Sequence, residues 1–299
     1  MIDLEKLIEP DSLKEFLQKD FGQTWRHFQG ESGRFEHILS EDRLLDILAS
    51  TELALQSISV IHAGQRLPPE LYGVPGQATH SIKPDIQKIT HHLSQGSAVL
   101  VTHLEQLDRS IWDCTEGLGQ FFEESVTVNA YLSGPHSNSF DLHIDHHDVL
   151  VFQIAGEKNW EVRAASLKHP LVLPEHMTEP PEEILWQSLL KSGDILYLPR
   201  GFWHRASTQA TPSLHLTFGL QPCTGLHLLG WIRKNLLKSE AFRADIPRRQ
   251  PGDHKNYLQD LKSILEQIED PKLLEQFLEE HKARIETERQ ELKAKLYPT

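Results

Sequence analysis

The feature that most constrains the fold is a two-residue hydrophobic period between residues 125 and 220. Apolar residues alternate with polar ones in SVTVNAYLS and SLHLTF, and further strands are expected at AVLVTHL, DVLVFQI, NWEVR and DILYLP. Successive side chains of a strand point to opposite faces, so each strand has a second, polar face. That face carries amides, phenols and imidazoles with few charges. It suits either a solvent-exposed sheet or the lumen of a small barrel that holds one ligand, and alternation alone leaves both open.

Helical patterns flank this region on both sides. Residues 1 to about 60 are predicted to be helical, with Ser40 as a helix N-cap. Beyond Pro222 an apolar helical stripe runs from Leu258 to Ile285 and is interrupted at Pro271. The tail either packs as a solvated helical pair on the core or forms a homodimer. We therefore predict an α+β chain with a mainly helical flank (1–94), a barrel (95–222) and a C-terminal helical domain (223–299).

Composition narrows the class of protein. The chain has 299 residues and a formal net charge of −13, which disfavours direct DNA binding through the overall field. It has two cysteines, Cys114 and Cys223, too far apart in sequence for a CxxC redox or zinc motif. The N-terminus is acidic, and no run of 18 apolar residues occurs. A cytoplasmic protein with no membrane association is expected.

The chain has an unusually large number of histidines, 18, and the spacing of some of them indicates a metal site. His143 and Asp145 are two residues apart, so on a strand both point to the same face. His204, presented by the turn in GDILYLPRGFWHRA, is the candidate third ligand. Two histidines and one carboxylate on one face leave three positions open, which suits Fe(II), whereas zinc more often has four His or Cys ligands.

The other histidines are interpreted differently. His146 and His147 are adjacent and would point to opposite faces of a strand, so we expect them to face solvent or to lie behind the ligands. His215 shares a polar face with Thr217 and could orient a ligand or cosubstrate, and the role of His136 is left open.

Two separated motifs carry a family resemblance. The stretch NAYLSGPHSNSFDLHIDHHDVLVFQIAGEKNWEV, followed by GDILYLPRGFWHRA, resembles the Jumonji-C oxygenases of the cupin superfamily and, within them, the ribosomal-oxygenase group. The resemblance covers about residues 95 to 220. It implies a double-stranded β-helix, or jelly-roll, barrel that uses Fe(II), 2-oxoglutarate and O₂ to hydroxylate a substrate. With this resemblance, the lumen interpretation of the polar faces is preferred.

The resemblance also assigns roles to individual residues. His143, Asp145 and His204 match the iron ligands, and Lys158 in GEKNW matches the basic residue that pairs with the distal carboxylate of 2-oxoglutarate. Residues beside the cosubstrate are matched by Asn129, Tyr131 and Thr217. A dicarboxylate in a low-dielectric pocket needs a cation at its distal end, which supports the role of Lys158. Trp160 and Trp203 are expected to serve in barrel packing.

The class of substrate can be inferred only by analogy with the family that the sequence resembles. The resemblance implies hydroxylation of a side chain of a protein or peptide, with a ribosomal protein as one candidate. The related ribosomal enzymes end in a winged-helix module, whereas this tail shows no strand pair for a wing, so a ribosomally made biosynthetic peptide is also considered. Demethylation would use the same iron chemistry. The remaining alternatives are a metal cupin enzyme independent of 2-oxoglutarate, which has no need for Lys158, and a non-catalytic metal-binding scaffold.

Overall fold

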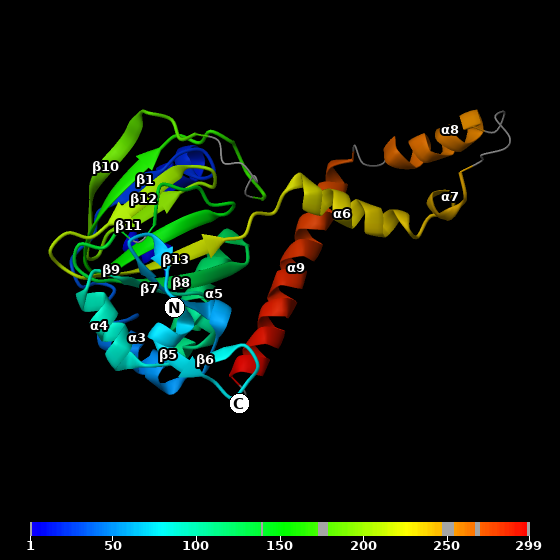
Figure 1. Cartoon of the computed structure of the whole chain (residues 1–299). Helices are drawn as coiled ribbons and strands as arrows, with labels where there is room; N and C mark the ends of the chain where they lie inside the picture. Colours follow the sequence, from blue (N-terminus) through cyan, green and yellow to red (C-terminus); the bar gives the residue numbers. More distant parts are fainter. Residues whose placement is uncertain (1, 139, 173–178, 247–253, 267–269, 298–299) are drawn as a thin grey trace. The chain divides into compact units, whose positions relative to one another are not determined.

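The structure is a computed structural model that describes residues 2–138, 140–172, 179–246, 254–266 and 270–297. The chain divides into two compact units, Met1–Gln221 and Pro222–Thr299. The first unit contains the predicted barrel together with the N-terminal flank, and the second contains the helical tail (Figure 1). The proposed subdivision of the first unit at residue 94 stays a prediction. No helix within the described ranges has the length and apolar character needed to cross a membrane.

The first unit combines short helices with antiparallel strands. Its helical segments are α1 (Leu4–Leu7), α2 (Pro10–Glu15), the π-helix η1 (Phe16–Asp20), α3 (Glu41–Ser50), the 3₁₀ turns η2 (Leu55–Ser57), η3 (Pro69–Leu71) and η4 (Leu104–Gln106), α4 (Ile86–Ser94) and α5 (Arg109–Phe122). Its strands are β1 (Arg26–Phe28), β2 (Leu53–Ala54), β3 (Ile58–His62), β4 (Gln65–Arg66), β5 (Gly73–Pro75), β6 (Ser81–Pro84), β7 (Ala98–Val101), β8 (Val126–Ser133), β9 (Asp148–Arg163), β10 (Ile184–Lys191), β11 (Ile195–Leu198), β12 (Trp203–Ser207) and β13 (Ser213–Leu220).

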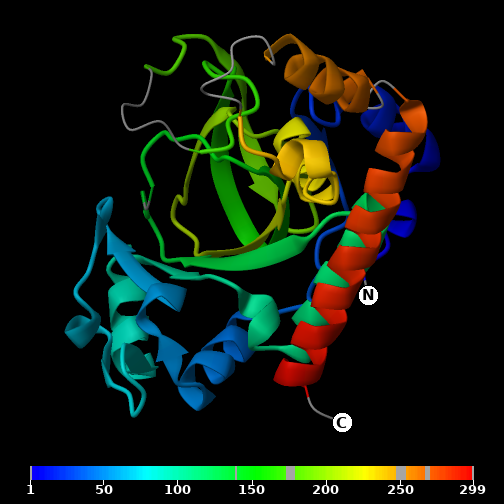
Figure 2. The ribbon, with the colours of Figure 1, turned by 90° about the vertical axis from the view of Figure 1, so that its right-hand side faces the viewer.

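The long strand β9 organises the barrel. The segments DVLVFQI and NWEVR, predicted as separate strands, are the two halves of this one 16-residue strand. Its first half pairs with β11 and β13, and its second half pairs with β10 and β12. The main sheet continues from β13 through β8, β7 and β3 to β4. One strand therefore belongs to both walls, and Figures 1 and 2 show these walls facing each other, as in the predicted double-stranded β-helix.

The two faces of the main sheet have different environments. Val128, Ala130, Leu216 and Phe218 are almost fully buried in the main hydrophobic core, which also includes residues from α3, α4 and α5. In both views the helices α3 and α4 lie on one side of the barrel (Figures 1 and 2). Residues that alternate with these positions, namely Tyr131, His215 and Thr217, line a cavity on the opposite face. The polar faces therefore line the lumen, as the resemblance implied, and not an open solvent face.

The N-terminal flank differs from the prediction. The expectation that residues 1 to about 60 are helical is wrong for β1, β2 and most of β3. Strand β1 pairs with β11, and β3 pairs with β7, so both extend the barrel wall. A two-residue turn at Ala63 and Gly64, both with positive φ, joins β3 to β4. Burial on both faces removes the alternation that identifies a strand, because β3 reads as a short apolar run.

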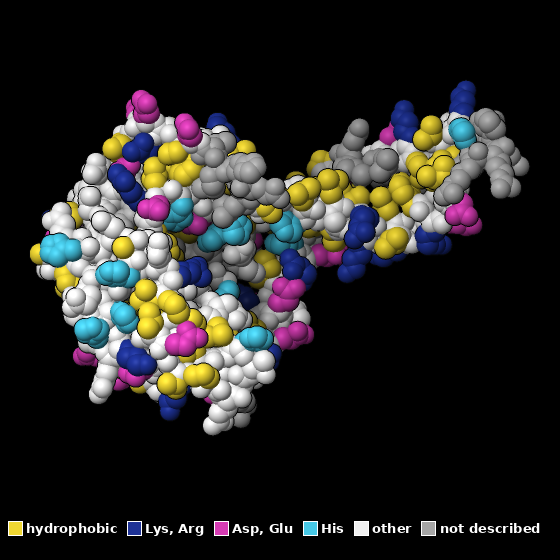
Figure 3. Space-filling view, in the orientation of Figure 1, with side chains coloured by type: hydrophobic (Ala, Val, Ile, Leu, Met, Phe, Trp, Pro, Cys, Tyr) yellow, Lys and Arg dark blue, Asp and Glu magenta, His cyan; other side chains and the backbone are white. Residues whose placement is uncertain are grey.

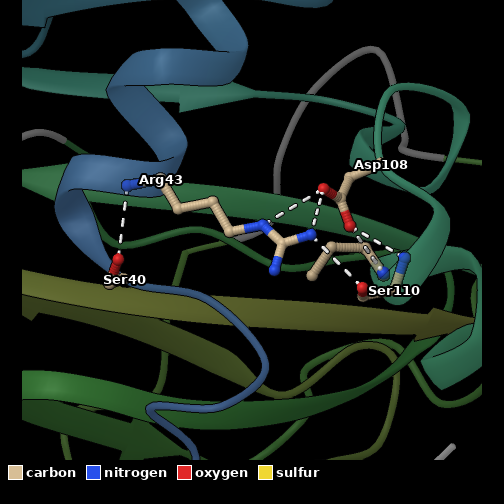
Figure 4. A network of polar contacts seen from close by, with 5 residues as sticks. Ser40, Arg43, Asp108 and Ser110 are labelled. Atoms are coloured by element: carbon tan, nitrogen blue, oxygen red, sulfur yellow. Dashed lines mark hydrogen bonds and ion pairs between the residues drawn. The ribbon is translucent and has the colours of Figure 1, made fainter.

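A polar network joins α3 to the start of α5 (Figure 4). Ser40 is the N-cap of α3, as predicted, and its hydroxyl accepts a hydrogen bond from the Arg43 N–H at 3.2 Å. The Arg43 guanidinium donates to Asp108 Oδ2 at 2.6 Å and to Ser110 Oγ at 3.2 Å. Asp108 Oδ1 in turn accepts from the Ser110 and Ile111 N–H groups, so it caps α5. The Asp108 carboxylate thus caps α5 and also holds Arg43 of the neighbouring helix α3.

The second unit is mainly helical in its described residues. It consists of α6 (Gly225–Leu236), α7 (Glu240–Arg243), α8 (His254–Leu265) and α9 (Pro271–Leu296), and Pro271 is the first residue of α9. No described residue of the unit forms a strand. Large apolar side chains are exposed on these helices (Figure 3), including Leu226, Leu229, Leu258, Leu274 and Leu278. Ile268, which the predicted stripe includes, lies outside the described residues.

Candidate active site

A cavity of about 250 Å³ lies inside the barrel and brings together residues from distant segments. It is lined by Arg66, Leu100, Tyr131, Phe140, His143, Asp145, Val149, Val151, Lys158, Trp160, His204, Ala206, His215 and Thr217. Six of the seven predicted site residues are in this set, and Asn129 is the exception. The cavity has the size and mixed lining of a small-molecule site with a few convergent polar groups.

His143, Asp145 and His204 converge at one end of this cavity. One ligand-type atom from each lies within 4.8 Å of the others. The backbones of His143 and His204 form an isolated antiparallel bridge, with N···O distances of 3.1 and 2.8 Å. His204 Nε2 is 3.5 Å from Asp145 Oδ2. His143 and Asp145 therefore lie in a segment that pairs with β12 through a single bridge. They do not lie in the regular strand predicted from the sequence.

Backbone contacts determine which ring nitrogen of each histidine faces the cluster. His143 Nδ1 lies 2.8 Å from the Asp141 carbonyl oxygen, and His204 Nδ1 lies 3.1 Å from that of Phe202. A protonated Nδ1 that donates to a carbonyl leaves Nε2 free to bind a metal ion. Burial lowers the pKa of His204 to about 4, and the neighbouring His143 acts in the same direction. His204 is therefore neutral at pH 7, as a ligand must be.

The Asp145 carboxyl group is held in its charged form. Burial alone would raise the pKa of Asp145, but the histidines around it, led by His204 and His143, lower it below its ordinary value. A carboxylate and two imidazoles on one side of a cavity form the donor set of a 2-His-1-carboxylate site. The arrangement supplies three ligands and leaves the cavity side of the cluster for further ligands.

Asp148 fixes the turn that presents His204. It is buried at the start of β9, where Oδ1 accepts from the Arg200 N–H at 3.1 Å and Oδ2 accepts from the Tyr197 hydroxyl at 2.5 Å. Within the same turn, the Gly201 N–H donates to the Asp145 carbonyl at 2.9 Å. Gly201 has φ of 86°, and a Cβ there would lie 2.4 Å from a backbone oxygen, so a larger residue is excluded. The turn is thereby fastened to the segment that carries Asp145.

The same cavity contains a buried lysine. The side chain of Lys158 comes from the second half of β9, and the residue is 3% exposed. Its ammonium group lies 5.9 Å from the centre of the Tyr131 ring and has no carboxylate partner among the described residues. Burial lowers the pKa of Lys158 to about 7. An unpaired buried cation is costly, so an anionic ligand in this cavity would relieve a real free-energy penalty.

Aromatic rings form the wall around this lysine. Tyr131 and His215 are stacked with ring centres 4.7 Å apart and an interplanar angle of 6°, and Trp160 meets His215 edge-on at 5.7 Å. Burial, reinforced by the charge of Lys158, lowers the pKa of His215 well below its usual value, so the ring is neutral. His215 Nδ1 and Trp160 Nε1 are both buried without a hydrogen-bond partner in the described structure.

The remaining predicted residues are placed as follows. Thr217 lines the cavity, whereas Asn129, its cross-strand neighbour, accepts a 3.3 Å hydrogen bond from the His103 N–H and is absent from the lining. His146 is exposed, and neither it nor His147 lines the cavity, as expected for residues behind the ligands. His136, exposed in a left-handed turn, is also absent from the lining.

The two tryptophans have different roles in the structure. Trp203 is buried, and its indole N–H donates to Ser166 Oγ at 2.8 Å, which fits the packing role expected for it. Trp160 is equally buried but lines the cavity with an unsatisfied N–H, so packing does not describe it fully.

Sequence reasoning missed several residues of the lining. Arg66 comes from the β3–β4 hairpin of the N-terminal flank, and Phe140 and Ala206 form another part of the wall. Arg66 has an exposed side chain, and its only local signal is a glycine turn between two short polar-ended strands. No spacing rule brings residue 66 next to residues 140 and 206.

Comparison with known proteins agrees with the barrel and its site. Residues 99–228 match the family model described as the JmjC domain. The fold, the donor set and this match agree with one another: residues 99–228 are similar to JmjC domains, and their barrel is of the double-stranded β-helix type.

Within that class the similarity is to the ribosomal-oxygenase group. The chain is 27% identical over 227 residues to the Dictyostelium discoideum protein named bifunctional lysine-specific demethylase and histidyl-hydroxylase NO66, covering 72% of this chain and 42% of that protein. It is 25% identical over 284 residues to the uncharacterized protein YxbC of Bacillus subtilis, covering 89% and 84%. The chain thus spans less than half of its NO66 relative.

A solved structure with the same fold is YcfD, a ribosomal oxygenase from Escherichia coli, in complex with cobalt and 2-oxoglutarate. The two structures superimpose with a TM-score of 0.60 at 18% sequence identity, covering 90% of this chain and 70% of that one. At this level of identity the likeness concerns the fold, and it includes both the barrel and its flanks.

Proposed function

We propose that this protein is an Fe(II)- and 2-oxoglutarate-dependent oxygenase that hydroxylates a side chain of a protein or peptide. One observation carries the proposal: a 2-His-1-carboxylate cluster and an unpaired, buried lysine line the same cavity. A metal-binding scaffold would need only the cluster. A cupin enzyme independent of 2-oxoglutarate would have no use for the lysine, whose burial is costly.

The residues present fit the metal ion. His143 and His204 would offer Nε2, because each Nδ1 lies against a backbone carbonyl, and Asp145 would offer one carboxylate oxygen. These donors suit Fe(II) with three positions left for other ligands. When bound, Fe(II) and 2-oxoglutarate supply the chemistry that transfers one atom of O₂ to a C–H bond and the other to succinate, with release of CO₂.

The residues at the other end of the cavity fit a dicarboxylate. Lys158 would pair with the distal carboxylate, and the His215 and Trp160 nitrogens that lack partners could donate to it as neutral groups. Val149, Val151 and the aromatic rings exclude water, which strengthens these contacts. The chain's own contribution is therefore to bind and orient the cosubstrate and to keep the reacting centre dry.

The substrate class is supported by the relatives' names. Proteins called ribosomal oxygenase and histidyl-hydroxylase match the catalytic region, and protein side chains are their implied targets. We therefore take a ribosomal protein as the first candidate substrate. The relative's double name also keeps demethylation as a possible second reaction, and the two reactions differ in product mass.

The test uses the full-length protein with Fe(II), 2-oxoglutarate and O₂. Succinate formation is measured first, and then ribosomal proteins and cell extract are searched by mass spectrometry for peptides heavier by one oxygen atom. We expect succinate together with a modified peptide. Absence of succinate would reject the oxygenase, turnover of a free metabolite alone would reject the protein substrate, and loss of a methyl group would indicate demethylation.

We further propose that the helical tail contributes to a homodimer and that the protein acts in the cytoplasm. Exposed leucines on α6, α8 and α9 support the first statement, since an apolar surface of this kind calls for a partner. Light scattering of the full-length protein and of residues 1–221 tests it. A monomeric mass for the full-length protein would reject the dimer.

A further inference from the structure

A second hollow adjoins the candidate active site and has no role so far. Its volume is about 360 Å³, and it shares Phe140 and Ala206 with the lining of the cavity. These two residues are therefore the wall between the hollow and the proposed site of reaction. We call the hollow the amide groove because Asn138, Asn159 and Gln187 lie along it.

The groove is formed by the reverse face of strands that carry the active site. Along β9, Lys158 and Trp160 line the cavity, whereas Asn159 and Glu161 line the groove, as strand alternation requires. Glu161 is the cross-strand partner of Gln187 on β10 and of Arg205 on β12. The position of the groove relative to the ligands is thus fixed by the register of the sheet.

The three carboxamides of the groove are free to bind. No side-chain hydrogen bond ties Asn138, Asn159 or Gln187 to another described residue. Each carboxamide offers both a donor and an acceptor, which matches the N–H and C=O groups of a peptide backbone. The lining also lacks the large apolar surface that a lipid or an aromatic metabolite would require.

Backbone hydrogen bonds hold another wall of the groove along the edge of β12. His204 exchanges both backbone hydrogen bonds with His143, and the Thr208 N–H donates to the Ser137 carbonyl at 3.0 Å. Asn138, Phe140 and Asp141, which line the groove, come from the segment that these two contacts hold beside β12.

The charges of the groove are unevenly compensated. Glu161 is 3% exposed, and its two oxygens pair with Arg163 and Arg205, each at 2.6 Å. This leaves the Asp141 carboxylate as the charge without an ion pair in the described groove lining. A ligand that follows the groove would therefore place a basic side chain near Asp141.

We propose that the amide groove binds the main chain of the polypeptide substrate as an extended segment beside β12, with a basic side chain at Asp141. This inference rests on the proposed function and names the substrate segment it requires. The residue to be hydroxylated enters the cavity past Phe140 and Ala206, and the flanking residues occupy the groove.

The experiment uses the full-length protein and acid-extracted bacterial ribosomal proteins as the probe, with the modified peptide then synthesised. We compare KM for that peptide in Asn159→Ala/Gln187→Ala, in Asp141→Asn and in the control Gln77→Ala, an exposed carboxamide outside the groove. Iron content and KM for 2-oxoglutarate are measured in every variant, to separate loss of the groove from loss of the fold. We expect the double variant to raise the peptide KM at least tenfold and Asp141→Asn about fivefold.

A charge swap provides the decisive comparison. Replacing the basic residue of the peptide by glutamate is expected to raise KM for the wild type, and Asp141→Lys is expected to restore most of the loss. A peptide KM unchanged in the groove variants, or a charge swap without rescue, overturns the inference while leaving the oxygenase intact. If the wild type modifies no polypeptide but still forms succinate, the protein substrate fails and the groove proposal fails with it.

Discussion

The two ends of the cavity differ in how their polar groups are satisfied. At the ligand end, His143 and His204 each have a backbone carbonyl within hydrogen-bond distance of Nδ1, and Asp145 lies against His204. At the other end, called here the anchor end, the Lys158 ammonium lacks a carboxylate, and the buried nitrogens of Trp160 and His215 lack partners.

This difference indicates what each end requires. The ligand end is held in place by the fold itself, through the His143–His204 bridge and the turn fastened by Asp148. The anchor end has polar groups whose partners must come from outside, because buried polar groups without hydrogen bonds are rare and costly. We therefore expect substitutions at the ligand end to abolish metal binding, and those at the anchor end to weaken the cosubstrate in graded steps.

The largest effect is expected at the ligand end. Asp145→Ala removes the only carboxylate of the predicted donor set, so stoichiometric iron binding should be lost. The matched control is His146→Ala, which removes an exposed neighbour that does not line the cavity. Metal analysis after anaerobic loading measures both. Full iron occupancy in Asp145→Ala would show that the donor set is wrong.

The next largest effect is expected for substitution of Lys158. Lys158→Ala removes one partner of the proposed buried charge pair and should weaken 2-oxoglutarate binding by about 2 to 5 kcal/mol. Lys191→Ala, an exposed lysine on β10, is the control and should leave the titration unchanged. Iron content should stay the same in both variants. Identical cosubstrate titrations for wild type and Lys158→Ala would remove the anchor role and the main support for the function.

A smaller effect is expected when the indole of Trp160 is replaced. Trp160→Phe keeps a large aromatic ring but removes the buried N–H that has no partner. If this group donates to the bound carboxylate, the loss should be about 1 to 2 kcal/mol, the range for one hydrogen bond to a charged group. The measurement is the KM for 2-oxoglutarate at constant iron occupancy. An unchanged KM would mean that Trp160 serves only in barrel packing, as predicted from the sequence.

The smallest effect is a pH dependence. Burial lowers the pKa of Lys158 to about 7, and a bound carboxylate would raise it again because it favours the charged form. Between these two pKa values the protein takes up a proton when it binds 2-oxoglutarate, so affinity falls as pH rises. We expect roughly a fivefold loss from pH 7 to pH 8. Lys158→Arg, which stays protonated, should show no such loss; equal slopes for both proteins would contradict this assignment.

Sequence reasoning was most successful where a feature follows from the spacing of residues close together in the chain. The alternation in SVTVNAYLS predicted β8, and the pair His143 and Asp145 pointed to the cluster that the structure brings together with His204. It was least successful at β10, which it did not identify, and at β3, which has no alternation because both faces are buried. It also predicted two strands, DVLVFQI and NWEVR, where the structure has the single strand β9, which continues through Gly156.

The sequence by itself determined which chemical groups are available. It predicted a strand-rich region with polar inner faces, two histidines and a carboxylate as candidate ligands, and Lys158 in a region with few lysines. These are properties of neighbours along the chain, and strand geometry converts them directly into shared faces. Tertiary structure alone decided that Lys158 is buried without a carboxylate, that Arg66 reaches the cavity, and that Ala206 separates the cavity from a groove. Those facts depend on contacts between residues many tens of positions apart, which the register of the closed barrel fixes and local spacing does not.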